Sequence, residues 1–346
     1  MTYSNKIKWQ SPSNIALIKY WGKKGDQLPN NASLSMTLKK SVTDTELSYF
    51  PSTDGMEVRY FFENERNEEF EDKVIRFFEK LKTQFTFLDD YLFEIRSSNT
   101  FPHSTGIASS ASSMSALALC LVSMEQKVKG IELSEYDFLQ RASHIARLGS
   151  GSASRSVYGG WVTWGIIDGI EDTSDQFATP LLYDIHEKFT NMGDAVLLVS
   201  SEKKNVSSSL GHCLMNIHPF APARYEQAAA NLQALLASMQ LGDFETFASV
   251  VENEALTLHA LLMTSSANGL LMKPGSLQII EAIRRFRKET GTDICFTLDA
   301  GPNMHLLYPI SEKTKVLQFI QAELTPFCEN GKWIDDETGD GPIHSK

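Results

Sequence analysis

The chain has 346 residues, of which 42% are hydrophobic and 22% are charged, a composition typical of a folded globular protein that is long enough for two domains. Its formal net charge of −11 argues against a nucleic-acid-binding protein. The charge is unevenly spread, because residues 1–40 hold seven lysines and one acid, Asp26, a local charge of +6 that leaves −17 for the other 306 residues. A basic segment on an acidic body suits an anionic substrate, although a solvated surface is the commoner explanation of such a cluster.

The sequence also indicates the cellular compartment in which the protein is expected. The first ten residues lack the apolar run of a signal peptide, and the longest nearly apolar run, Met114 to Met124, has 11 residues, too few to cross a bilayer. Four cysteines lie far apart without a C-x-x-C pattern, which argues against a zinc or redox site and fits a reducing compartment. We therefore expect a cytoplasmic protein with neither a membrane nor a nucleic-acid partner.

The chain opens with a strand predicted at residues 6–9. The Ser-Pro-Ser-Asn stretch at 11–14 is expected to break this strand before the segment 15–23, which contains two lysines and two large aromatic residues beside a glycine. Lys19 follows four apolar residues, so its charge is expected to be buried and to need an anionic partner. This segment is a candidate clamp for an anion.

Residues 28–38 read as a polar turn that enters a strand. Two strand-like runs, 42–50 and 56–62, are separated by the turn from Pro51 to Gly55 and predict a hairpin. Apolar residues recur at helical spacing from Phe70 to Leu81, which predicts a helix that packs on the sheet.

The segment from Phe101 to Cys120 reads as a small-residue loop that enters a buried helix near Ser110. A helix start offers unpaired N–H groups and a partial positive charge, and serine hydroxyls add further donors. We therefore predict a phosphate site here. A serine cap on an ordinary core helix explains the same residues about as well, because serine is a favoured N-cap and no P-loop or G-x-G-x-x-G pattern is present.

A second unusual loop follows a helix that Ser134 is expected to cap and Gly149 to end. Residues 148–160, LGSGSASRSVYGG, place Arg155 among small residues ahead of a strand at 161–166. An arginine held in such a loop suits bidentate binding of a carboxylate or phosphate. A flexible linker is the alternative, but a core helix and a tryptophan-rich strand bracket this loop.

The second half begins after the polar stretch 171–180, a candidate domain boundary, and we place the domains at 1–185 and 186–346. Its predicted elements are strands at 194–200, 294–298 and 304–308, helices at 222–240, 244–264, 277–290 and 313–324, and a polar tail, with a basic, serine-rich turn at 203–209. Asp299 stands where a strand meets a Gly-Pro break, a position that can serve chemistry, although a lone aspartate there is more often a turn former. Strands and helices interleaved in both halves predict an α+β fold.

Five separated segments resemble, in order, the GHMP family of small-molecule kinases, and within it the branch that decarboxylates 5-diphosphomevalonate. They are NIALIKYWGK with LPNNASLSMTL, FPHSTGIASSAS, RLGSGSASRSVYGG, KKNVSSS and FTLDAGPN. The resemblance implies an N-terminal domain like the second domain of ribosomal protein S5, a ferredoxin-like C-terminal domain and an active site in the cleft between them. It also implies a cytoplasmic homodimer of the mevalonate pathway that converts ATP and (R)-5-diphosphomevalonate into isopentenyl diphosphate, carbon dioxide, ADP and phosphate for isoprenoid synthesis.

The resemblance also implies roles for individual residues. Asp299 would orient or deprotonate the 3-hydroxyl group, Arg155 would hold the substrate carboxylate, and Lys19 would screen the charge around Asp299. The residues implied to bind ATP phosphates are Ser104, Gly106, Ser109, Ser110 and Ser112, with Mg²⁺ held mainly through those phosphates and Ser110 as a candidate ligand. The residues implied to bind substrate are Tyr20, Trp21, Gly22, Lys23, Arg66, Ser150, Gly151, Ser152, Ser207, Ser208 and Ser209.

Three alternatives stay open at this stage. A phosphomevalonate decarboxylase would use the same catalytic residues but expect a monophosphate. A kinase of this family that does not decarboxylate would have no use for Arg155 as a carboxylate ligand. A ligand-binding homologue without turnover would not need Asp299 beside a phosphoryl acceptor. The chain also departs from the family pattern at His103 to Gly106 and at Ser113, in the loop expected to contact ATP.

Overall fold

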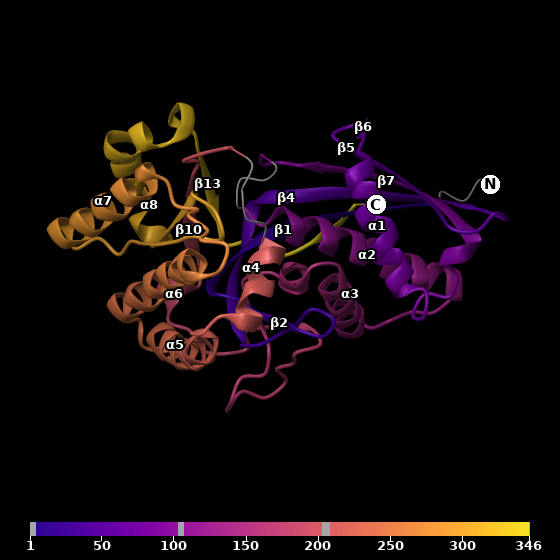
Figure 1. Ribbon diagram of the computed structural model, residues 1–346, viewed down its shortest axis with the longest axis horizontal. Helices are drawn as coiled ribbons and strands as arrows, with labels where there is room; N and C mark the ends of the chain where they lie inside the picture. The colour runs from indigo at the N-terminus through magenta and orange to yellow at the C-terminus, as the bar shows by residue number, and fades with distance from the viewer. Residues whose placement is uncertain (1–4, 103–106, 203–207, 346) are drawn as a thin grey trace.

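The structure is a computed structural model that describes residues 5–102, 107–202 and 208–345. Ser104, Gly106 and Ser207, three predicted ligands, lie outside these residues. The chain folds into two halves, each a sheet covered by helices, which lie side by side in Figure 1. This arrangement confirms the predicted two-part α+β fold.

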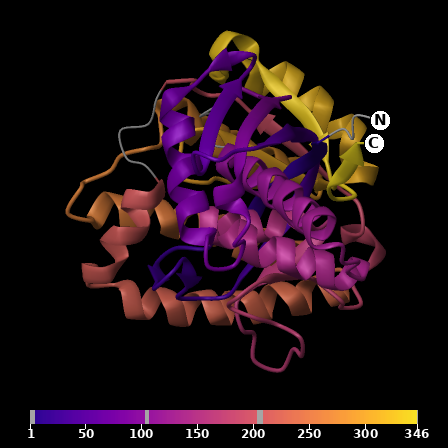
Figure 2. The same cartoon turned by 90° about the vertical axis from the view of Figure 1, so that its right-hand side faces the viewer.

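The N-terminal half is built on a long, mostly antiparallel sheet with the strand order β14-β1-β4-β7-β5-β6, in which β8 and β9 extend from β4. Its strands are β1 (Lys6–Ile18), β4 (Ser33–Pro51), β5 (Glu57–Phe62), β6 (Glu65–Arg66), β7 (Tyr91–Asn99), β8 (Trp161–Trp164), β9 (Ala178–Pro180) and β14 (Ile343–Ser345), and a separate short pair is formed by β2 (Lys23–Lys24) and β3 (Leu28–Pro29). The helices α1 (Glu68–Leu81), α2 (Ser109–Lys129) and α3 (Glu135–Gly149) pack together on the sheet (Figures 1 and 2).

Local sequence signals account for these helices. The side chain of Asn67 caps α1 by accepting the backbone N–H of Phe70, and the hydroxyl of Ser134 caps α3 by accepting that of Asp137. Gly130 ends α2 in the left-handed conformation that glycine adopts at low cost. The predicted starts of α1, α2 and α3 are confirmed to within two residues.

Two predictions about the strands were wrong. The polar stretch 11–14 does not break the first strand, because β1 runs through it with an irregularity in its pairing to β4 between Pro12 and Asn14. The runs at 42–50 and 56–62 do not form a hairpin, because β7 lies between β4 and β5 and pairs with β5 in parallel. Both errors arise because pairing partners far along the chain decide the sheet.

The C-terminal half is a four-stranded antiparallel sheet in the order β11-β12-β10-β13, which is the order of a ferredoxin-like split βαβ fold. Its strands are β10 (Met192–Leu197), β11 (Cys295–Thr297), β12 (Met304–Pro309) and β13 (Trp333–Glu337), and its helices are α4 (Ser208–Leu214), α5 (Ala221–Leu241), α6 (Phe244–Thr264), α7 (Pro274–Thr290) and α8 (Lys313–Phe319). The tail that was predicted as merely polar forms β13 and β14, and β14 returns to pair with β1 of the other half.

A shared apolar core joins the halves. Ile15 and Leu17 of β1 and Met36 of β4 pack in one cluster with Leu235 of α5 and Phe247 of α6. The ends of β1 and β4 are therefore buried against the C-terminal helices, which brings the residues after β1 close to residues that follow 200 in sequence. The domain boundary near residue 185 stays a prediction. Within the described ranges, no helix has both the length and the hydropathy to cross a membrane.

Candidate active site

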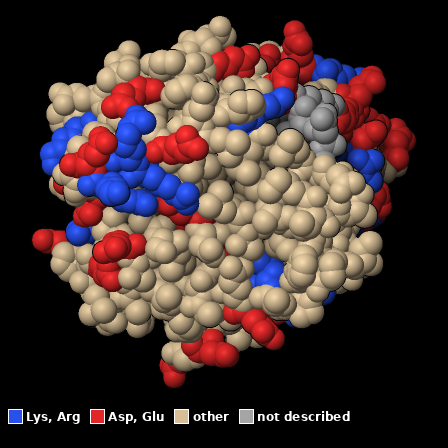
Figure 3. Space-filling model, turned by 60° about the vertical axis from the view of Figure 1, so that its left-hand side comes forward, with Lys and Arg blue, Asp and Glu red and all other residues tan. Residues whose placement is uncertain are grey.

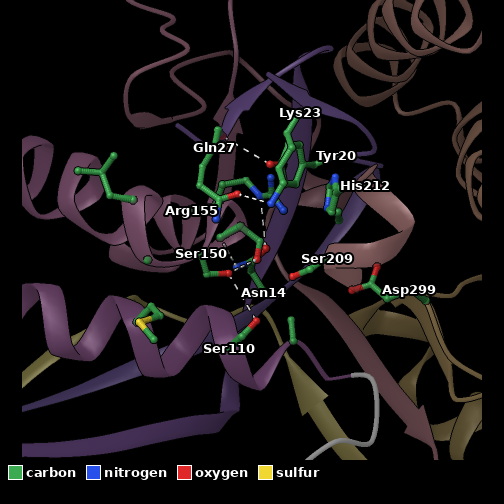
Figure 4. Close-up of a pocket in the computed structure, with 18 of the residues that line it drawn as sticks. Asn14, Tyr20, Lys23, Gln27, Ser110, Ser150, Arg155, Ser209, His212 and Asp299 are labelled. Carbon is green, nitrogen blue, oxygen red and sulfur yellow. Dashed lines mark hydrogen bonds between the residues drawn. The ribbon is translucent and has the colours of Figure 1, made fainter. Parts of the chain in front are cut away.

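A cavity of about 510 Å³ lies where the two halves meet (Figure 4). Its walls come from the end of β1, from α1, from the start of α2, from the loop after α3, from α4 and α6, and from the loop after β11. The predicted site residues that line it are Lys19, Tyr20, Trp21, Lys23, Ser110, Ser150, Gly151, Ser152, Arg155, Ser209 and Asp299. Segments separated by up to 280 positions in the sequence therefore converge on one cavity.

Lys19 and Asp299 form an ion pair across the junction of the two halves. The Nζ atom of Lys19 donates to Oδ1 of Asp299 at 2.9 Å, and only 2% of the lysine side chain is exposed, compared with 27% of the aspartate. Burial lowers the pKa of Lys19, and the nearby carboxylates of Asp299 and Glu254 partly oppose this effect, while Arg155 adds to it. The predicted anionic partner of the buried lysine is thus Asp299.

Arg155 lies in the short 3-10 helix Gly151–Val157 and is 2% exposed. Its guanidinium donates from Nε to Oδ1 of Asn14 at 3.3 Å and from Nη1 to Oγ of Ser33 at 2.7 Å. Burial lowers its pKa to about 10, with Asp299 and Tyr20 opposing the shift. Among the residues that the structure describes, no carboxylate pairs with this guanidinium, and a buried cation in that position favours an anionic ligand.

The loop around Arg155 is rigid rather than a linker. A Cβ atom on Gly151 would lie 2.8 Å from the ring of Tyr20 and 2.9 Å from that of Trp164, so only glycine fits there. The hydroxyl of Ser154 donates to the carbonyl of Gly151 at 2.8 Å. The small residues of this loop therefore permit close packing beneath the cavity, and the linker alternative is wrong.

The start of α2 presents serines that do not cap it. The N-cap residue is Ala108, with a φ of 41° and no side-chain cap, so the alternative of a serine N-cap is wrong. Ser110 lines the cavity, and its Oγ lies 3.5 Å from Oγ of Ser150 in the facing loop. The first turn of this 21-residue helix thus faces the cavity with an exposed hydroxyl, as a phosphate site requires.

His212 of α4 is a cavity residue that the sequence reasoning missed. Its Nδ1 atom accepts the backbone N–H of Gly22 at 3.0 Å, and its ring contacts Tyr20 and Trp21 at centroid distances of 4.2 and 4.9 Å. Burial lowers its pKa to about 3, and Lys23 and Arg155 add to the shift. The imidazole is therefore neutral at physiological pH.

Helix α1 contributes three further cations that were not predicted. Lys73, Arg76 and Lys80 line the cavity, and they recur at spacings of three and four on one face of the helix, beside its apolar stripe. That spacing is visible in the sequence and could have identified them. The structure also adds Asn14 and Gln27, of which Gln27 accepts from Nζ of Lys23 at 2.8 Å.

The structure places four predicted residues elsewhere. Arg66 lines a different cavity, beyond α1, where its guanidinium pairs with Glu71 at 2.8 Å, so its assignment to the substrate site was wrong. Ser112 is buried with its hydroxyl 2.6 Å from that of Thr43, so it cannot serve a ligand without losing that bond. Gly22 and Ser109 are not among the cavity-lining residues, and the backbone N–H of Gly22 donates to Nδ1 of His212. The side chain of Ser208 lies outside the part of the chain that the structure describes.

The described residues contain no group of three or more His, Cys, Asp or Glu side chains that could hold a metal ion. On the face in Figure 3, the largest group of basic side chains is bordered by acidic ones, as on an ordinary solvated surface.

Comparisons with known proteins agree on one family. Residues 11–178 match the diphosphomevalonate decarboxylase-like N-terminal domain, and residues 195–340 match the mevalonate 5-diphosphate decarboxylase C-terminal domain. The diphosphomevalonate decarboxylase of Eremothecium gossypii is 30% identical over 349 residues, which cover 93% of this chain and 82% of that protein. The crystal structure of mevalonate diphosphate decarboxylase from Staphylococcus aureus is 28% identical, with a TM-score of 0.83 and coverage of 99% and 98%. The complex of MDDEF with MVAPP, AMPPCP and magnesium is 26% identical, with a TM-score of 0.83 and coverage of 99% of both chains.

Proposed function

Since the chain belongs to the diphosphomevalonate decarboxylase family, we propose that it catalyses the ATP-dependent decarboxylation of (R)-5-diphosphomevalonate to isopentenyl diphosphate in the mevalonate pathway. The products are carbon dioxide, ADP and phosphate. The similar MDDEF complex holds MVAPP, AMPPCP and magnesium, which supports ATP and Mg²⁺ as the cofactors.

The observation that carries the proposal is the buried guanidinium of Arg155. It has no acidic partner among the described residues, it is oriented by the neutral groups of Asn14 and Ser33, and it lines the same cavity as the pair of Lys19 and Asp299. An enzyme that only phosphorylates an alcohol needs the aspartate but has no use for a second buried cation aimed at a carboxylate. The cavity therefore suits a substrate with both a hydroxyl and a carboxylate.

The chemistry follows from these three side chains. A tertiary hydroxyl is a poor leaving group, so we propose that Asp299 orients it or accepts its proton while the γ-phosphoryl group of ATP is transferred to its oxygen. Lys19, 2.9 Å from Asp299, stabilises the negative charge of that carboxylate. The C3–O bond to the phosphate then breaks, and the electron pair of the bond to the carboxylate forms the double bond as carbon dioxide leaves. Arg155 holds the carboxylate in the orientation that this elimination needs.

The phosphate groups have separate cationic surroundings. We propose that the first turn of α2 with Ser110 binds the ATP phosphates, aided by the cations of α1, and that ATP brings Mg²⁺ with it. We propose that Lys23, Tyr20 and Ser209, which line the same cavity, bind the 5-diphosphate. The number of cationic side chains around the cavity suits two polyanionic substrates better than one.

One assay tests the function. ADP and carbon dioxide should be released in equal amounts when the protein is given ATP, Mg²⁺ and 5-diphosphomevalonate, and much less of both should form with the 5-monophosphate. Preference for the monophosphate would instead indicate a phosphomevalonate decarboxylase, and ADP without carbon dioxide a kinase. Neither product with either substrate would indicate a ligand-binding homologue.

We also propose a cytoplasmic location, which the four free cysteines support because thiols persist in a reducing compartment. The homodimer stays a prediction that sedimentation or light scattering can test.

A further inference from the structure

Behind the cavity lies a buried ion pair to which the proposed chemistry assigns no role. Arg224 of α5 and Glu254 of α6 are 1% and 0% exposed, and two parallel hydrogen bonds of 2.6 Å join the guanidinium to the carboxylate. Asn231 donates a further bond of 2.7 Å to Oε1 of Glu254. Burying two charges is costly, and apolar residues of similar volume often serve stability as well or better. A buried pair of this kind therefore calls for an explanation beyond stability.

The pair is bonded to the backbone of Lys19. Oε2 of Glu254 accepts the backbone N–H of Lys19 at 2.9 Å, and Nη2 of Arg224 donates to its carbonyl at 3.3 Å. Asn31 also donates to that carbonyl at 3.1 Å. Strand β1 ends at Ile18, so Lys19 is the first residue beyond the ladder, and side chains replace the strand partners that would otherwise fix its backbone.

Helix α6 contacts the partner of Lys19 as well. His259, five residues after Glu254 on the same helix, has Nε2 at 3.1 Å from the backbone oxygen of Asp299. One helix thus touches the backbone of both members of the catalytic ion pair, although Lys19 belongs to the N-terminal half and Asp299 to the C-terminal half. A single helix, α6, therefore sets the distance between the side chains of Lys19 and Asp299.

We propose that Arg224 and Glu254 are positioning residues that hold the backbone of Lys19 so that its ammonium group stays in register with Asp299. This inference rests on the proposed function, because it assigns Lys19 and Asp299 to the reaction. Neither Arg224 nor Glu254 lines the cavity, so both act through Lys19 and not on substrate.

The electrostatics supply a test that a purely structural role would not pass. The charged groups around Lys19 are Asp299, Glu254, Arg155 and Arg224, and Glu254 acts to raise the pKa that burial lowers. Glu254→Gln removes the negative charge and leaves Arg224 uncompensated, which should lower the pKa of Lys19. The alkaline limb of the pH profile of kcat should therefore move to lower pH by about one unit. Arg224→Met leaves Glu254 uncompensated and should move the same limb to higher pH. The double variant should bring the limb back close to its wild-type position.

Glu252→Gln is the matched control. Glu252 is a buried carboxylate on the same helix that pairs with Arg284 and Arg287, away from the cavity, so its replacement should lower the melting temperature without moving the profile. Shifts in opposite directions for Glu254→Gln and Arg224→Met, absent from the control, are the expected result. An unmoved limb in both, or shifts in the same direction, would overturn the positioning role.

A conservative variant covers the case in which a single charge change prevents folding. Glu254→Asp keeps the charge but shortens the side chain by one methylene, so the bond to the N–H of Lys19 is lost. We expect kcat to fall about tenfold, which corresponds to one hydrogen bond, with the KM of both substrates nearly unchanged. An unchanged kcat would overturn the proposal. Wild-type protein that releases neither ADP nor carbon dioxide would instead refute the proposed function itself.

Discussion

Arg155→Lys separates decarboxylation from phosphorylation. The guanidinium uses Nε and Nη1 on Asn14 and Ser33, which leaves its remaining N–H groups to bind a carboxylate. A lysine has one nitrogen in place of three, so it cannot keep both orienting bonds and also present two parallel donors. The positive charge is retained, and only the geometry is lost.

The magnitude follows from the number of bonds. Loss of two hydrogen bonds that involve a charged group costs about 3 to 6 kcal/mol in total, since each contributes about 1.5 to 3 kcal/mol. If these bonds act in the elimination step, carbon dioxide release should slow by about a hundredfold to ten-thousandfold. Transfer of the phosphoryl group depends on Asp299 and should be much less affected, so the 3-phosphate intermediate should accumulate.

The assay is a single turnover with carboxyl-labelled substrate, in which ADP and carbon dioxide are followed in one sample. Arg147→Lys is the control, because Arg147 is also buried, but its guanidinium donates to Gln176 and Asp26 outside the cavity. The control should lower stability and keep the ratio of carbon dioxide to ADP at one. A full rate in Arg155→Lys with matched products would refute the carboxylate-holding role, and an equal fall of both products would assign Arg155 to binding alone.

Three further changes test other parts of the cavity. Asp299→Asn should bind both substrates yet lose several orders of magnitude in rate, because an amide accepts no proton, and more than about a tenth of wild-type turnover would exclude the aspartate from the mechanism. Ser110→Ala should raise the KM for ATP or lower the rate by about 1 to 3 kcal/mol in transition-state free energy, and unchanged ATP kinetics would remove this serine from the phosphate site. Burial lowers the pKa of His212 to about 3, so the unfolded chain binds a proton below about pH 6.5 that the folded protein does not. Stability should therefore fall by about 2 kcal/mol from pH 7 to pH 5 through this group alone, and denaturation curves of His212→Asn should lack that part of the fall.

The fold was predictable where local signals were strong. The helix α6 was predicted to the residue, Phe244–Thr264, and α7 was predicted to within three residues at its start, because apolar spacing and the ending Gly291 agree. Strand neighbours were not predictable in this way. A turn such as Pro51 to Gly55 suggests that the strands on either side of it pair with each other. Instead, β4 and β5 both pair with β7, and no residue near the turn indicates this pairing.

The residues proposed for catalysis were noticed through their local context, but their roles came from the family resemblance. Lys19 among apolar residues and Arg155 in a small-residue loop stand out from their neighbours in the sequence, whereas the context of Asp299 at a strand end favours a turn former. Arg66 was misplaced because a short motif does not say on which side of a helix its residue lies. Here Arg66 lines a second cavity with Ile75 and Glu79 of α1, whereas Lys73 and Arg76 of the same helix line the cavity between the halves.

The positioning residues could not be found by the same route. Arg224 and Glu254 lie within α5 and α6, and a charged residue in a helix normally marks its solvent face. They are buried because the end of β1 enters the C-terminal core. The backbone groups of Lys19 there have no strand partner in the described part of the chain, and they face helices that lie more than 200 residues further along the chain. A backbone N–H has no signature in the sequence, so side chains recruited to satisfy it have none either. Residues proposed to bind substrate can thus be selected by their own chemistry, whereas residues proposed to hold the backbone of Lys19 can be predicted only after the end of β1 is placed.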